Sequence, residues 1–301
     1  MKNLIDLIEK NNLGRYKENV SLKTLTTYKV GGPAKLLYFP NSVESLKQVL
    51  KYLKENNIKH KIFGNGSNIL ASSKEYDGVI IKLTDLKTLK QDGENIEVEA
   101  GYNFALLANT VSREGYKGLE FACGIPATVG GAVYMNAGAY LSDVSNVLTK
   151  VDILDENLEI KTLENKDLDF SYRHSIFMEK NWTILKAYFK LEKGNKEEII
   201  DLIEDRKQRR ISSQPLNYPS AGSVFRNPEG MYAGKLIEDA NLKGFIKGGG
   251  EISDKHANFI INKDNASAED IKYLMDLAKQ KVKEEYGVDL KIEQELFNWE
   301  E

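Results

Sequence analysis

Residues 124–140 read GIPATVGGAVYMNAGAY, a run dense in Gly and Ala that holds one Pro and no charged side chain. Side chains this small let a backbone approach a ligand closely, and Gly tolerates the positive φ values of tight loops. We therefore expect the N–H groups of Thr128–Gly131 to turn toward one anion, as in the nests that bind phosphates. The run lacks a strand-flanked GxGxxG and a P-loop Lys, and a packed loop without a ligand is the alternative.

A second run of the same kind, GNGSNIL at Gly64–Leu70, follows the apolar residues Ile62 and Phe63. Turn-forming Asn and Gly dominate it, and two phosphate-sized loops in one chain suit a cofactor with a diphosphate. Both runs resemble the FAD-binding loops of the UDP-N-acetylenolpyruvoylglucosamine reductase (MurB) family, flavoenzymes of peptidoglycan precursor synthesis. That family belongs to the flavoproteins with the vanillyl-alcohol-oxidase type of FAD domain, and its motifs recur here in order along nearly the whole chain.

The resemblance implies FAD as the bound cofactor and NADPH as the reductant. It assigns FAD binding to most residues of the two runs, namely Gly64, Asn65, Gly66, Ser67, Asn68, Ile69, Leu70, Gly124, Ile125, Pro126, Ala127, Thr128, Gly130, Gly131, Ala132, Asn136, Ala137 and Gly138. Ala127 stands where Gly is common in the family, so its backbone is expected to avoid positive φ.

Composition excludes several classes of protein. The 301 residues are 41% hydrophobic, which is typical of a globular chain large enough for more than one core. With 42 basic and 45 acidic residues, the net charge of −3 gives no reason to expect nucleic acid or an anionic membrane as a partner. Cys123 is the only cysteine, expected as a buried filler, and a reducing compartment is favoured. No apolar run is long enough to span a bilayer. The N-terminal segment is charged, and its apolar residues are too interrupted for a signal peptide. We expect a cytoplasmic protein that is a monomer.

The predicted fold class is α+β. It comprises a two-lobed FAD-binding domain of the vanillyl-alcohol-oxidase (PCMH) type and a C-terminal α+β substrate-binding domain. We place an N-terminal helix and polar connector at 1–22, the FAD-binding domain at 23–194 with two subdomains divided near 85–95, and the substrate domain at 195–301. The last boundary lies where the pattern changes from strand-rich to helix-led.

Apolar spacing and turn residues predict the individual elements. Helices are expected at Leu4–Leu13, from Ser42 through Leu53, from Asn103 to about Glu114, from Lys196 to about Arg210, at Tyr232–Asp239 and at Ala268–Tyr286, with Gly287 as the stop. Strands are expected at Ala34–Phe39, His60–Phe63, Val79–Leu83, Ile96–Ala100, Trp182–Leu191, His256–Asn262 and around Leu290–Phe297. A hairpin is expected for Val147–Leu154 and Leu158–Thr162.

Two motifs of the family have clear counterparts. Ser171-Tyr-Arg-His-Ser175 is similar to its Tyr-Arg-x-Ser motif, which implies that Arg173 pairs with a substrate carboxylate, whereas a salt bridge is the alternative. Ser220-Ala-Gly-Ser-Val-Phe-Arg-Asn-Pro228 is similar to its Ala-Gly-Ser-x-Phe-Lys/Arg-Asn-Pro motif, which implies that Ser223 is the proton donor. A serine is a weak acid, so this role requires a neighbouring cation or hydrogen-bond relay.

The third motif matches less closely. Leu290-Lys-Ile-Glu-Gln-Glu295 aligns with the family's Leu-Glu-Pro-Glu-Val segment, which makes Glu293 the catalytic candidate. Ile292 replaces the usual Pro and Gln294 the usual Val. Glu295 lies two residues on, on the same strand face, and is the rival; a solvated carboxylate is the remaining alternative.

Other candidate substrate contacts follow from the same resemblance: Tyr172, Arg209, Arg226, Asn227, Lys255 and His256. Arg210 is an alternative to Arg209, because cations near the helix end and the Gln214-Pro215 turn could reach a diphosphate. No Cys, His and Asp residues have metal-ligand spacing, so no metal is expected. The short stretch between Arg173 and Ser223 leaves no room for the tyrosine-loop insertion, so the chain resembles the compact subtype.

The implied activity is the NADPH-dependent, FAD-mediated reduction of UDP-N-acetylglucosamine enolpyruvate to UDP-N-acetylmuramate, with a UDP-sugar as substrate. Two alternatives stay open. One is a flavin oxidase of another small molecule on the same FAD domain, and the other is a non-catalytic flavin- or nucleotide-binding module.

Overall fold

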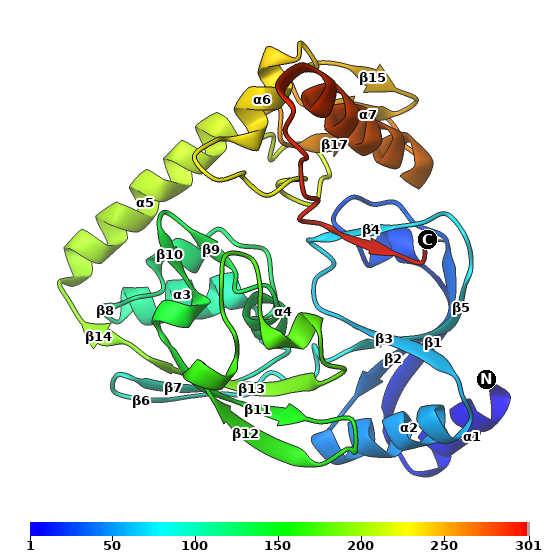
Figure 1. Ribbon diagram of the computed structural model, residues 1–301. Helices are drawn as coiled ribbons and strands as arrows, with labels where there is room; N and C mark the ends of the chain where they lie inside the picture. The colour runs from blue at the N-terminus through cyan, green and yellow to red at the C-terminus, as the bar shows by residue number, and fades with distance from the viewer. Residues whose placement is uncertain (300–301) are drawn as a thin grey trace. The chain divides into compact units, whose positions relative to one another are not determined.

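The computed structural model describes residues 1–299, so the last two residues of the predicted domain 195–301 lie outside the described part. Contacts divide the chain into two units (Figure 1). Unit 1 comprises Met1–Glu18, Lys35–Asn65 and Asp77–Gln208, and unit 2 comprises Asn19–Ala34, Gly66–Tyr76 and the chain from Arg209 onward. The predicted domains are continuous along the chain, whereas these units interleave, and the domain boundaries stay predictions.

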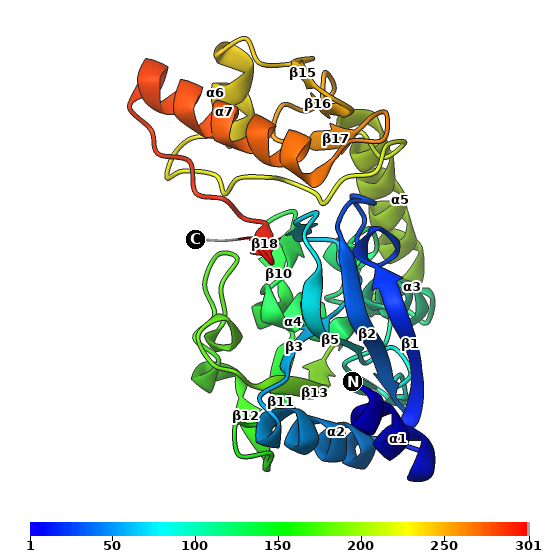
Figure 2. The same cartoon turned by 90° about the vertical axis from the view of Figure 1, so that its right-hand side faces the viewer.

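A four-stranded sheet opens the chain, in the order β1-β2-β5-β3. Its strands are β1 (Gly14–Ser21), β2 (Pro33–Pro40), β5 (Tyr76–Lys82) and β3 (Lys59–Phe63), the last two being parallel. Helices α1 (Lys2–Lys10) and α2 (Val43–Glu55) contact each other (Figure 2). As predicted, Ser42 caps α2, and its Oγ accepts a hydrogen bond from Ser45 N at 3.0 Å.

A five-stranded antiparallel sheet forms the rest of the unit 1 core. Its order is β12 (Ile160–Glu164), β11 (Leu148–Leu154), β13 (Thr183–Lys190), β7 (Asn95–Glu99) and β6 (Leu89–Asp92). Helices α3 (Phe104–Arg113) and α4 (Val129–Tyr134) lie against this sheet (Figure 1). The predicted β11–β12 hairpin and the Asn103 cap of α3 are confirmed.

Short elements complete unit 1. Two small ladders pair β8 (Tyr116–Lys117) with β14 (Glu192–Lys193), and β9 (Gly138–Ala139) with β10 (Ser142–Asp143). Helix α5 (Lys196–Ser213) follows and continues into the segment that contacts assign to unit 2.

Unit 2 has its own apolar core, in which buried residues of α6 (Ala233–Asp239) and α7 (Ala268–Tyr286) pack together. A three-stranded antiparallel sheet runs in the order β15 (Ile246–Lys247), β16 (Gly250–Ile252) and β17 (Ile260–Asn262). Strand β4 (Ile69–Ala71) pairs in parallel with β18 (Glu295–Phe297). Helix α7 ends as predicted, at Gly287 in the left-handed region with φ 70°.

Three expectations about elements are wrong. The predicted polar connector contains strand β1, which reads as polar because it is an edge strand with little burial. The predicted strand His256–Asn262 shortens to β17, because Phe259 N bonds to His256 O and closes a turn. The predicted strand Leu290–Phe297 shortens to β18, because its first half pairs with another segment through a single bridge.

Candidate active site

The central run contains a short helix and is not a loop throughout its length. It contains α4, which begins after Thr128, whose Oγ1 caps the helix. The N–H groups of Val129, Gly130 and Gly131 donate to Tyr102 O, Ala100 O and Thr128 Oγ1, at 2.9, 2.8 and 3.2 Å. The expectation that the N–H groups of Thr128–Gly131 converge on an anion is therefore wrong, because these three donors are engaged within the protein.

Gly130 of α4 serves close packing. A Cβ added at Gly130 would lie 3.0 Å from the Cβ of Ala100, and the backbone there is helical, with no positive φ. Ala127 also avoids positive φ, as expected. Small side chains in this run thus let α4 lie close to the backbone segment that contains Ala100.

The two predicted loops meet at their near ends. A Cβ at Gly64 would lie 2.8 Å from Thr128 Oγ1, and Asn65 Nδ2 donates to Pro126 O at 3.1 Å. Their predicted proximity is found at this point.

The second run contains the remaining candidates for anion binding. Among the described residues, the N–H groups of Asn65, Gly66 and Ser67 donate to no protein acceptor. Gly66 has φ 65°, and a Cβ there would lie 2.1 Å from Leu25 O, so only Gly fits. Three adjacent unsatisfied donors beside a residue without a side chain fit the diphosphate of FAD.

Arg173 stands at the tip of a tight turn in unit 1. Ser171 and His174 exchange backbone hydrogen bonds of 3.3 and 3.1 Å, so Tyr172 and Arg173 are the two central turn residues. Arg173 has φ 57°, a conformation that costs an L-residue about 1–2 kcal/mol. Its Nη2 donates to Gly138 O at 2.7 Å, and its guanidinium lies 5.1 Å from the ring centroid of Tyr172. Strain of this kind persists only where the surroundings hold it.

Residues of the central run hold the Arg173 turn in this conformation. Asn136, which is buried and has φ 41°, donates from Nδ2 to Ser171 O at 3.0 Å. Ser175 Oγ donates to Tyr134 O at 2.6 Å. The predicted cofactor residues Asn136 and Gly138 therefore also position the Arg173 turn.

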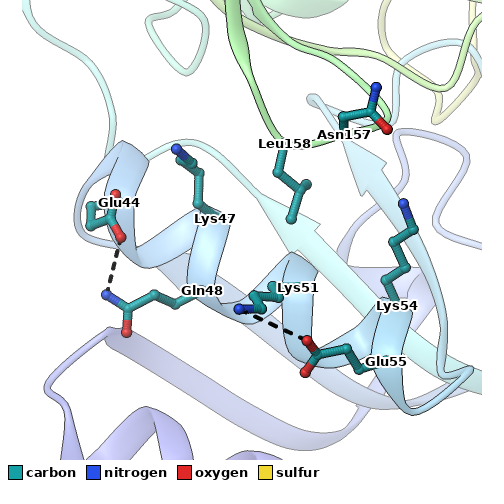
Figure 3. Close-up of a pocket in the computed structure, with 8 residues that line it drawn as sticks. All are labelled: Glu44, Lys47, Gln48, Lys51, Lys54, Glu55, Asn157 and Leu158. Atoms are coloured by element: carbon teal, nitrogen blue, oxygen red, sulfur yellow. Dashed lines mark hydrogen bonds and ion pairs between the residues drawn. The ribbon is translucent and has the colours of Figure 1, made fainter.

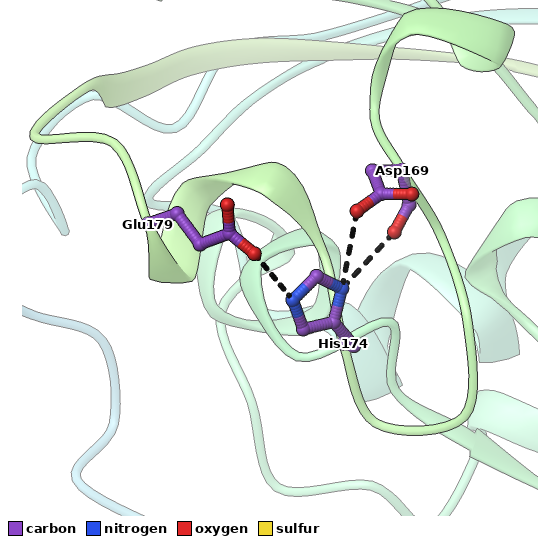
Figure 4. Close-up of side chains that lie close together, drawn as sticks. All are labelled: Asp169, His174 and Glu179. Atoms are coloured by element: carbon purple, nitrogen blue, oxygen red, sulfur yellow. Dashed lines mark hydrogen bonds and ion pairs between the residues drawn. The ribbon is translucent and has the colours of Figure 1, made fainter.

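A cluster beside this turn was missed from the sequence. Asp169, His174 and Glu179 bring one ligand atom each within 4.8 Å of one another, although no metal-ligand spacing was found in the sequence (Figure 4). His174 Nε2 lies 3.2 Å from Glu179 Oε1, and its Nδ1 lies 3.1 Å from the main-chain oxygen of Asp169. Both ring nitrogens thus have protein partners that brace the turn. Spacings of five residues gave no signal, because neither a helix nor a strand relates them.

Ser223 lies in unit 2, on an irregular segment that two neighbours hold. Val224 N donates to Asn258 O at 2.9 Å, and the Asn258 side chain bonds both Phe225 N and Phe225 O, at 3.0 and 2.8 Å. On the other side, Glu293 N donates to Val224 O at 2.8 Å. Ser223 and Glu293 are therefore brought together through their main chains.

The same network reaches the second run. Asn68 Nδ2 donates to Glu293 O at 3.1 Å, and Glu295 N donates to Asn68 O at 2.8 Å. Glu293 is thus bonded to the residue that follows Ser223, whereas Glu295 belongs to the β4–β18 ladder. Arg173 lies in unit 1, and its meeting with Ser223 and Glu293 stays a prediction.

The predicted substrate contacts of unit 2 have structural bonds of their own. Asn227 Oδ1 accepts from Ala233 N at 3.1 Å, and Lys255 Nζ donates to Ile211 O at 2.6 Å. His256 Nδ1 accepts from Asn258 N at 3.2 Å, and burial lowers the pKa of its imidazole. Arg226 N bonds to Lys291 O, and Arg209 O accepts from Ser212 Oγ. Their substrate roles stay predictions.

Two further features lie apart from these groups. Cys123 is half-buried and not the fully buried filler expected, and burial raises the pKa of its thiol to about 11, which disfavours the reactive thiolate at neutral pH. A shallow pocket runs along α2 and contains none of the predicted site residues (Figure 3). It is lined by Glu44, Lys47, Gln48, Lys51, Lys54, Glu55, Asn157 and Leu158. Within the described residues, no helix has the length and apolar character needed to cross a bilayer.

Comparisons with known proteins cover nearly the whole chain. A model of an FAD binding domain matches residues 34–164, and a model of the UDP-N-acetylenolpyruvoylglucosamine reductase C-terminal domain matches residues 214–297. A UDP-N-acetylenolpyruvoylglucosamine reductase of Caldanaerobacter subterraneus subsp. tengcongensis is 47% identical over 92% of each chain. One from Bacillus pumilus is 42% identical over 100% of each chain.

Solved structures agree. The crystal structure of UDP-N-acetylenolpyruvylglucosamine reductase (MurB) from Thermus caldophilus matches with a TM-score of 0.82 and 33% identity, over 94% of this chain and 99% of that one. Berberine bridge enzyme from Eschscholzia californica matches with a TM-score of 0.53 and 13% identity, over 64% of this chain and 44% of that one. At that identity the likeness concerns the fold alone, and it agrees with the predicted type of FAD domain.

Proposed function

The chain belongs to the UDP-N-acetylenolpyruvoylglucosamine reductase family, and from this premise we propose that NADPH is its electron donor and that Ser223, Arg173 and Glu293 act on the substrate. It is accordingly an FAD-dependent oxidoreductase of peptidoglycan precursor synthesis, with a UDP-sugar as substrate and UDP-N-acetylmuramate as product. When bound, FAD supplies the hydride chemistry, taking electrons from NADPH and delivering a hydride to the vinyl carbon.

The observation that best supports these proposed roles is a network of hydrogen bonds in unit 2. It joins Asn68, at the end of the run with the free N–H donors, to Glu293, and Glu293 to the residue after Ser223. A cofactor diphosphate bound at Asn65–Ser67 would therefore be linked by this hydrogen-bond network to Ser223, the candidate acid, and to Glu293, the candidate carboxyl group. This connection supports a cofactor and a proton donor that act in one reaction.

Each side chain has a distinct task in the proposed reaction. The Arg173 guanidinium pairs with the substrate carboxylate and stabilises the negative charge that develops on it. Ser223 Oγ donates its proton to the carbon adjacent to the one that receives the hydride. Glu293 stabilises the intermediate together with Arg173.

The remaining proposals concern the oligomeric state of the enzyme and its location in the cell. We propose that the enzyme works as a monomer in the cytoplasm; the single cysteine, which can form no disulfide within the chain, supports the cytoplasm. Size-exclusion chromatography with light scattering at several concentrations tests the monomer, and a mass that doubles with concentration would contradict it.

An anaerobic two-step experiment tests the function. The purified yellow protein is bleached with NADPH, and UDP-N-acetylglucosamine enolpyruvate is then added. The account predicts return of the flavin absorbance with one UDP-N-acetylmuramate formed per flavin, identified by mass. A flavin oxidase would instead recolour only when oxygen is admitted, and a protein that binds flavin without catalysis would not be bleached by NADPH.

The role of Arg173 has its own test. Arg173→Lys keeps the charge but loses the planar fork that pairs with a carboxylate. We expect bleaching by NADPH to be unchanged and recolouring by the substrate to slow by roughly 10- to 100-fold. Equal slowing of both steps would remove Arg173 from its assigned task.

A further inference from the structure

A buried amide beside the candidate site has no assigned task. Gln294 is 4% exposed and directly follows Glu293 in the chain. Its Nε2 lies 3.0, 3.2 and 3.3 Å from three consecutive carbonyl oxygens, those of Ala221, Gly222 and Ser223. A buried side-chain amide that bonds three adjacent carbonyls fixes the path of the backbone that carries them.

That backbone has two other restraints on its N-terminal side, because Asn262 N donates to Pro219 O at 2.9 Å and the Ala221 side chain is buried in the unit 2 core. Gly222 has φ 75°, and an added Cβ would meet nothing within 4 Å, so packing does not confine this residue. No helix or strand contains residues 221–224. The first bond of the Asn258 network falls on Val224 N, after Ser223. The Gln294 amide is therefore the side chain that restrains the carbonyls of Gly222 and Ser223 themselves.

The amide itself is oriented by a second buried group. Tyr28 is 0% exposed, and its hydroxyl donates to Gln294 Oε1 at 3.0 Å. The three carbonyl oxygens can only accept hydrogen bonds, so Nε2 must face them, and Oε1 is left to accept from the Tyr28 hydroxyl. Burial also raises the pKa of the Tyr28 hydroxyl, so it remains a donor at neutral pH. Asn262 Nδ2 in turn donates to Tyr28 O at 2.9 Å, which fixes the main chain of Tyr28.

We propose that Gln294, oriented by Tyr28, is a positioning residue that holds Ser223 for proton transfer. The inference rests on the proposed role of Ser223 as the acid. A hydroxyl is a weak acid and transfers a proton efficiently only from a fixed geometry. Loss of the hydrogen bonds from Gln294 to the Ser223 segment, which we call the Gln294 clamp, therefore slows the proton transfer alone. Hydride uptake from NADPH does not involve Ser223 and is not affected.

The test uses the flavin-loaded full chain and follows bleaching by NADPH and recolouring by the enolpyruvyl substrate separately. Gln294→Met keeps the volume of the side chain and removes its hydrogen bonds. We expect bleaching within about twofold of the wild type and recolouring slowed by about 10- to 100-fold. Deuterium exchange of the peptide around residues 220–226 should become faster, which reports the loosened segment independently of activity.

A double-mutant comparison separates positioning from general damage. In a Ser223→Ala background the clamp has no acid to position, so adding Gln294→Met should change recolouring by about twofold or less. The same slowing in both backgrounds would overturn the inference and leave Ser223 as the acid. If Ser223→Ala alone leaves recolouring unchanged, the proposed function of Ser223 fails, and the inference fails with it.

Tyr28→Phe provides a second, milder variant if Gln294→Met does not fold. It removes only the hydroxyl that orients the amide, and we expect recolouring to slow by roughly threefold, again only when Ser223 is present. A Tyr28→Phe protein with wild-type recolouring would contradict the orienting role of Tyr28.

Discussion

The Arg173 turn and the Ser223 segment hold their candidate residues by different means. Arg173 lies in a strained two-residue turn that residues of the central run hold by hydrogen bonds. Helix α4 of that run packs tightly against the backbone segment at Ala100. Ser223 sits on an irregular segment held by the side-chain amides of Asn258 and Gln294. The first region depends on small side chains and close packing, and the second on buried hydrogen bonds.

The difference teaches where each region is vulnerable. In the first, an added methyl group should destabilise the chain because there is no room for it. In the second, removal of an amide should destabilise it because buried main-chain groups lose their only partners.

The largest expected effect is that of Asn258→Leu. It leaves Phe225 N and Phe225 O buried without their partner, and we expect a loss of about 2–4 kcal/mol in the free energy of unfolding. Urea unfolding followed by circular dichroism measures it. Asn56→Ala is the control, because this exposed amide bonds only to Tyr52 O, and it should cost less than about 0.5 kcal/mol. Equal losses would contradict the contrast.

The next effect distinguishes the two glycines of α4. Gly130→Ala brings a methyl group to 3.0 Å from Ala100 Cβ and should cost about 1–3 kcal/mol. Gly131→Ala meets only Thr128 Oγ1, at 3.3 Å, and gains helix propensity of about 1 kcal/mol, so it should be neutral or stabilising. If both variants unfold at the same urea concentration, close packing is not what selects Gly130.

A pH effect follows from His256 in the second region. Burial lowers its pKa in the folded chain, so below its ordinary pKa, near 6.5, the unfolded chain binds more protons. Stability from this group is therefore complete above about pH 6.5 and is lost as the pH falls through the folded pKa. The drop in unfolding free energy from about pH 7.5 to about pH 5.5 should be smaller for His256→Asn than for the wild type. An unchanged drop would refute this contribution.

The smallest effect concerns strain beside the Arg173 turn. Tyr140 and Leu141 form the tip between β9 and β10 with φ 55° and 61°, and the Leu141 side chain is fully exposed. Asn tolerates this conformation better than Leu, so Leu141→Asn should stabilise unit 1 by about 0.5–1 kcal/mol. Thermal unfolding measures it, and a lower melting temperature would mean that Leu141 makes contacts that its exposure does not reveal.

Local patterns predicted most elements, since caps such as Ser42 and Gly287 and the apolar spacing of α7 act within a few residues. They failed for α4, because two glycines oppose a short helix and only packing against Ala100 reveals it. Motifs proposed Ser223 and Glu293 as candidates, but they gave no sign of the amides of Asn258 and Gln294 that hold the Ser223 segment. Gln294 and Tyr28 are 266 residues apart, so no local pattern relates them.

The most direct test of the central claim is a single-turnover measurement on Ser223→Ala. After anaerobic bleaching by NADPH at the wild-type rate, addition of UDP-N-acetylglucosamine enolpyruvate should restore the flavin absorbance at least about 100-fold more slowly than in the wild type. Recolouring at the wild-type rate would show that another group protonates the substrate, and would contradict the site described for this chain.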